Sequence, residues 1–237
     1  RLEQGRATNP SEQVVEALSR ALRLSSVERA HLFHTAGLVP PGQGTVPAFI
    51  TPSVQRMLDR LTYTPVAVFD AACTLLLANP MYTALMGEFH GNDRNALWRN
   101  FLGAGTRVRH TPEGLLALQT AQTAQLRATA SKYPADHTVR RLVAELRAGS
   151  ELFTTLWDSG AMTRPDGARK TVDHPQVGAI TLDCDVLTID GADLSIMIYS
   201  AEPGTEDAER LALLAVVGTQ SLIASSATRC STTIPPS

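Results

Sequence analysis

The chain has 237 residues, of which 43% are hydrophobic and 19% charged, and a formal net charge of −2. This composition is typical of a soluble globular protein of one or two domains, and a near-neutral chain gives no argument for binding nucleic acid by charge alone. Three scattered cysteines without C-x-x-C spacing exclude a disulfide framework, and no metal site is predicted. No run approaches 18 apolar residues, so we expect a cytoplasmic protein without a membrane partner.

Two short amphipathic helices are predicted at the start of the chain, over residues 10–22 and 26–36. Apolar side chains recur at helical spacing in both segments, and Gly37 ends the second one. The stretch over 39–50 is rich in Pro and Gly, which stop helices and central strands. Residues 1–38 are therefore predicted to form one domain, joined by this linker to the remainder.

A mixed domain of helices and strands is predicted over residues 51–217. Two short β-type runs lie between residues 66 and 78, and alternating apolar and polar residues over 169–201 predict three further antiparallel strands. Several helical segments separate the two groups. The expected fold class is α+β, with a five-stranded antiparallel sheet and a helical insert. The polar stretch 218–237 is predicted to be a disordered tail.

One short helical segment places two arginines beside a tryptophan. Two guanidinium groups next to an indole would suit a carboxylate attached to an apolar chain. Alternatively, the arginines pair with acidic residues of the C-terminal half and the tryptophan belongs to the core. Nearby apolar residues could line an elongated cavity or fill a core. The candidate ligand-binding residues are Arg94, Asn95, Trp98, Arg99, Asn79, Met81, Leu85, Met86, Leu126 and Trp157.

The common signatures of enzymes are missing from the sequence. There is no G-x-G-x-x-G, no P-loop and no G-x-S-x-G motif. Asp173, His174 and Cys184 could supply an acid, a base and a nucleophile, but Cys184 lies in an alternating strand where small apolar side chains normally pack. We therefore expect no catalytic residues, no enzymatic activity and no cofactor.

Two parts of the chain resemble known families. RLEQGR followed by PSEQVVEALSRALRLSSVERAHLFHTAG resembles the C-terminal part of a helix-turn-helix domain of the XRE family. TPVAVFDAACTLLLAN, RNALWRNFL, QLRATASKYPADHTVRRLVAELRAGSELFTTLW and HPQVGAITLDCDVLTI resemble the ligand-binding domain of MmyB-like transcription regulators. The second resemblance implies a PAS-like fold that senses a small molecule, with a fatty acid or another amphipathic molecule as the expected ligand.

The sequence thus predicts a DNA-binding transcription regulator whose PAS-like domain senses an amphipathic small molecule such as a fatty acid. Arg1 and Arg6 fall at the end of the resembled recognition helix, so they are the candidate DNA contacts, and the first helices of that fold are expected to precede Arg1. A homodimer is expected, because operators commonly carry two half-sites. The alternative is a PAS-like lipid-binding or enzymatic domain against which the N-terminal helices merely dock.

Overall fold

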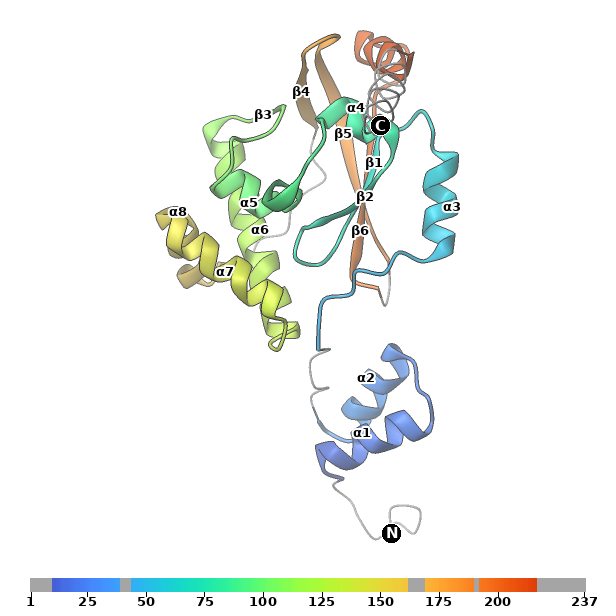
Figure 1. Cartoon of the computed structure of the whole chain (residues 1–237), viewed down its shortest axis with the longest axis vertical. Helices are drawn as coiled ribbons and strands as arrows, with labels where there is room; N and C mark the ends of the chain where they lie inside the picture. The colour runs from blue at the N-terminus through green and yellow to red at the C-terminus, as the bar shows by residue number, and fades with distance from the viewer. Residues whose placement is uncertain (1–9, 39–43, 162–168, 190–191, 217–237) are drawn as a thin grey trace, which may run out of the picture. The chain divides into compact units, whose positions relative to one another are not determined.

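The chain folds as two units, residues 1–44 and 45–237. The structure is a computed structural model (Figure 1) that describes residues 10–38, 44–161, 169–189 and 192–216. The predicted tail lies outside these ranges, and so do Arg1 and Arg6, so the finer domain boundaries stay predictions. In the part of the chain that is described, no helix is both long and apolar enough to cross a bilayer.

The first unit contains the two helices that the sequence predicted. They are α1 (Glu12–Ala21) and α2 (Ser26–Thr35). Val15 on α1 and Phe33 on α2 are almost completely buried, so each helix turns an apolar face inward. Arg29 on α2 reaches Glu16 on α1 with an N–O distance of 2.6 Å and lies over the Phe33 ring. Burial and an ion pair together fix the two helices against each other.

The second unit is built on a six-stranded antiparallel sheet with the order β2-β1-β6-β5-β4-β3. Its strands are β1 (Val66–Phe69), β2 (Leu75–Ala78), β3 (Val108–Arg109), β4 (Lys170–His174), β5 (Gly178–Ile189) and β6 (Leu194–Ser200). The α+β class is confirmed, as is the order of two strands, a helical insert and three strands. The predicted number of five strands is one too few, because β3 has only two residues and shows no alternation.

Helices lie on both sides of this sheet (Figure 1). On one face, α3 (Pro52–Arg60) packs Leu58 against Val66, Val68 and Ile196 of the sheet. The remaining elements are α4 (Pro80–Met86), the 3₁₀ turn η1 (Gly91–Arg94), α5 (Ala96–Phe101), α6 (Pro112–Lys132), α7 (His137–Gly149), α8 (Glu151–Ser159) and a helix over 206–216. Two further apolar cores form, one between α4 and the sheet and one among α5, α6, α7 and α8.

Three of these helices begin with the same local signal, a polar cap followed by proline. The caps Thr51, Asn79 and Thr111 each accept a hydrogen bond from a main-chain N–H of the first turn. Proline fits the next position, because its missing N–H would be unpaired there and its φ is already helical. These starts place α4 and α6 at defined points beside the sheet.

Candidate ligand-binding site

A cavity of about 570 Å³ lies between the sheet and helix α6. Its walls are side chains of β1, β5 and β6 on one side and one face of α6 on the other. That face carries Gly114, Ala117, Leu118, Ala121 and Gln125, at the three- and four-residue spacing that puts residues on one side of a helix. Because most of these side chains are small, α6 leaves a space within the usual size range of small-molecule sites.

Basic side chains gather at one end of the cavity. They are Arg109, His110, Arg169 and Lys170. Arg109 pairs with Asp173 at 2.5 Å, and Arg169 pairs with Asp183 at 3.0 Å. Among the residues that the structure describes, no carboxylate lies within 4.0 Å of the Lys170 ammonium group. Lys170 is therefore the cation at this end that an anionic ligand group could pair with.

The surroundings of Lys170 favour negative charge in a ligand. Burial lowers the pKa of His110, and the positive charge of Lys170 lowers it further, so this imidazole is neutral at pH 7. Helix α6 begins at Pro112, beside these residues, and the N-terminus of a helix carries partial positive charge. Thr111, Gly114 and Ala117 are exposed here, so the basic end is also the mouth of the cavity.

The opposite end is closed and lies at the turn between β1 and β2. Asp70 lines it together with Phe69 and Cys73, which are 5% and 9% exposed. Oδ1 of Asp70 accepts a hydrogen bond from Thr74 N at 2.8 Å, but burial still raises the pKa of this carboxyl group. Burial also raises the pKa of Cys73 to about 12, so the thiol stays protonated and is a poor nucleophile.

The comparison with known proteins assigns this domain. The family model described as the MmyB-like transcription regulator ligand binding domain matches residues 50–214, well over half of the chain. The chain belongs to this family. The search of curated proteins gave no match. Because the matched range contains every strand of the sheet and all of α6, the cavity lies within the ligand-binding domain of an MmyB-like regulator.

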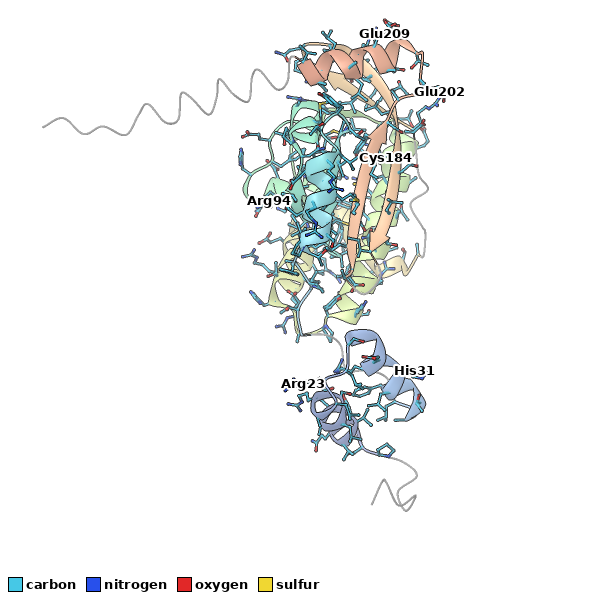
Figure 2. The ribbon with its side chains drawn as sticks, turned by 90° about the vertical axis from the view of Figure 1, so that its right-hand side faces the viewer. Arg23, His31, Arg94, Cys184, Glu202 and Glu209 are labelled. Atoms are coloured by element: carbon cyan, nitrogen blue, oxygen red, sulfur yellow. The ribbon has the colours of Figure 1, made fainter. Side chains whose placement is uncertain are left out.

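None of the ten predicted ligand-binding residues lines the cavity of this MmyB-like domain. Arg94 donates to Leu75 O at 2.7 Å and to Leu76 O at 3.2 Å, along the edge strand β2, where it borders a separate pocket. Figure 2 shows Arg94 away from Cys184, which lies on a central strand. Arg99 is 7% exposed, lies over the Phe89 ring and donates to a main-chain carbonyl. Neither arginine forms an ion pair with the acidic C-terminal half within the described ranges.

The two predicted asparagines are structural caps. Asn79 begins α4 by accepting from Tyr82 N, and it bonds three further main-chain groups. Asn95 begins α5 by accepting from Trp98 N, and it donates to Ala72 O. The amide groups of both residues are thus occupied by the fold itself.

The apolar candidates pack mainly in the cores. Met81, Leu85 and Met86 lie in the core between α4 and the sheet, whereas Leu126 lies in the core of α5 to α8. Trp157 packs on Phe153 with a ring separation of 5.5 Å, and Trp98 is half-buried. A ligand role for all ten residues stays a prediction. The sequence reasoning missed Asp70, Lys170 and the small face of α6, although Gly114, Ala117 and Ala121 at helical spacing were a usable signal.

The set Asp173, His174 and Cys184 is not assembled as a catalytic triad. Asp173 pairs with Arg109, and Nε2 of His174 lies 3.0 Å from Ala84 O. Burial lowers the pKa of His174, so its neutral form is favoured in the folded protein. No group of three or more His, Cys, Asp or Glu residues suited to a metal ion occurs in the described ranges.

Proposed function

We propose that the chain is a ligand-sensing transcription regulator whose MmyB-like domain binds an amphipathic small molecule with an anionic group, such as a fatty acid. The observation that carries the proposal is the cavity under α6, which is mainly apolar and is lined by Lys170 at its basic end. An acyl chain would lie along Phe69, Leu118 and Met197, and its carboxylate would lie beside Lys170.

DNA binding and dimer formation belong to the same proposal. The N-terminal helices would complete a helix-turn-helix domain of the XRE type, with Arg1 and Arg6 near the DNA, and two copies would bind two half-sites. A ligand can alter DNA affinity only if it binds one arrangement of the regulator more tightly than another. The family match supports the regulatory role, because it assigns residues 50–214 to the ligand-binding domain of such regulators.

The test uses hexadecanoate and the full chain. Isothermal titration should show binding, and Lys170→Gln should weaken it by at least about tenfold, the usual worth of a hydrogen bond to a charged group. Lys132→Gln is the matched control, because Lys132 pairs with Asp193 and does not line the cavity. Arg94→Ala tests the anchor predicted from the sequence and should leave the affinity unchanged.

Two results would count against the proposal. If the wild type and Lys170→Gln bind hexadecanoate with equal affinity, the carboxylate of the ligand does not lie beside Lys170. Extraction of the purified protein with organic solvent, followed by mass spectrometry, gives an independent reading. An intact amphipathic acid supports the sensor, whereas a chemically altered one would favour the enzymatic alternative.

A further inference from the structure

The closed end of the cavity carries a carboxylate, which the methyl end of a hydrocarbon chain does not match. Asp70 is partly buried there, and burying a carboxylate is costly unless it is paired or fully hydrogen-bonded. Main-chain amides of the turn, at Ala72 and Thr74, and the hydroxyl group of Thr74 donate hydrogen bonds to the carboxylate and compensate part of this cost. No Lys or Arg of the described ranges lies within 4.0 Å of the Asp70 carboxylate. An ionised carboxylate has about four acceptor sites, so the three hydrogen bonds of the turn leave about one for a ligand.

Other polar groups of the wall lie at the same end. Ser195 on β6 pairs directly with Phe69, the residue before Asp70. Gln125 on α6 lies one helical turn before Thr129, whose hydroxyl donates to Ala71 O at 2.8 Å in the turn that follows β1. The closed end therefore offers a carboxylate, an amide and a hydroxyl within an otherwise apolar wall.

The two polar ends are separated by most of the length of α6. Thr111 lies at the mouth with Lys170, and Gln125 lies near Asp70. Fourteen residues of α-helix at 1.5 Å each span about 21 Å. A molecule that reaches both ends must therefore be elongated, of roughly the length of an extended sixteen-carbon chain, and the wall between the ends is mainly apolar.

Building on the proposed function, we propose that the ligand carries polar groups at both ends: an anionic group beside Lys170 and a hydroxyl or ammonium group beside Asp70. A terminal hydroxyl donates to the Asp70 carboxylate and accepts from the Gln125 amide. A terminal ammonium group pairs with the same carboxylate. A methyl end gives neither group a hydrogen-bond partner and covers the remaining acceptor site of the carboxylate with hydrocarbon. The chemical class is thus a long-chain acid with a hydrogen-bond donor at its far end.

The experiment compares 16-hydroxyhexadecanoate with hexadecanoate, both titrated into the full chain. The hydroxy acid should bind at least about tenfold more tightly, because its hydroxyl gains a hydrogen bond to a charged group. Asp70→Asn should remove most of this preference. The variant keeps an oxygen that can accept from Thr74 N, so the turn should still fold. Asp59→Asn makes the same chemical change on the exposed side of α3 and should keep the full preference.

Three other outcomes of these titrations would refute part or all of the proposal. If both acids bind equally tightly to the wild type, the second polar end is refuted, while binding that depends on Lys170 would leave the proposed function standing. If the hydroxy acid is preferred equally by the wild type and Asp70→Asn, the assignment to Asp70 is wrong. If the folded protein binds neither acid, the proposed function fails and this inference fails with it.

Discussion

Replacing Asn79 by Ala tests whether this residue serves the fold or the ligand. Its side chain accepts from Val66 N at 3.0 Å and Tyr82 N at 2.9 Å, and it donates to Leu61 O and Thr64 O, both at 2.7 Å. Loss of the helix cap costs about 1 kcal/mol, and each of the other three buried hydrogen bonds costs about the same. The expected loss in the free energy of unfolding is about 4 kcal/mol, close to a thousandfold in the equilibrium constant.

Urea unfolding of the ligand-free chain measures this loss. Both tryptophans, Trp98 and Trp157, lie in the second unit, so their fluorescence reports on the unit that contains Asn79. The exposed Asn92 provides the control, because Asn92→Ala removes no buried hydrogen bond and should cost less than about 0.5 kcal/mol. A loss below about 1 kcal/mol for Asn79→Ala, combined with weaker ligand binding, would refute the structural role and support the role predicted from the sequence.

Three further predictions concern pH, thiol reactivity and packing. Burial lowers the folded-state pKa of His174 below its usual 6.5, so the unfolded chain binds more protons and the thermal midpoint should fall as the pH drops below that value. His174→Gln should flatten this profile, and an unchanged profile would contradict the assignment. With the other two cysteines replaced by Ser, Cys73 should react with a thiol reagent at pH 8 at least about a hundredfold faster in urea than in the folded state; similar rates would show an accessible thiol. Gly103→Ala should destabilise the protein by about 1–3 kcal/mol, because a Cβ atom would lie 2.9 Å from Arg99 Cα. The same urea measurement tests this, and a midpoint equal to that of the wild type would contradict the clash.

The fold was predictable where the determining signals are local. Thr51-Pro52, Asn79-Pro80 and Thr111-Pro112 each combine a cap with a proline, and the corresponding helices begin there. Strand β5 was predicted from alternation, and Ile180, Leu182 and Cys184 are indeed buried on one face. Strand β3 was missed, because its pairing with Val172 is a tertiary contact between distant segments.

The site was harder to predict, because its parts come from separate elements. Arg94 and Arg99 were predicted to bind a ligand because they lie close together in the sequence. In the structure, main-chain carbonyls of the surrounding segments accept their hydrogen bonds. Lys170 lies on β4 and Asp70 follows β1, and only the position of α6 over the sheet places them along one cavity. Residue type and spacing in the sequence do not predict that arrangement.

Neighbouring residues of one strand face opposite sides of the sheet, where one side lines the cavity and the other packs against α3. Along β6, Ser195 and Met197 line the cavity, whereas Ile196 and Ile198 belong to the core under α3. The same alternation in β1 turns Phe69 toward the cavity and Val68 toward α3. Substitutions at the first set of positions can change which molecule is recognised without altering the surface on which α3 rests. The residues that line the cavity and the residues that support α3 can therefore change independently, one residue apart.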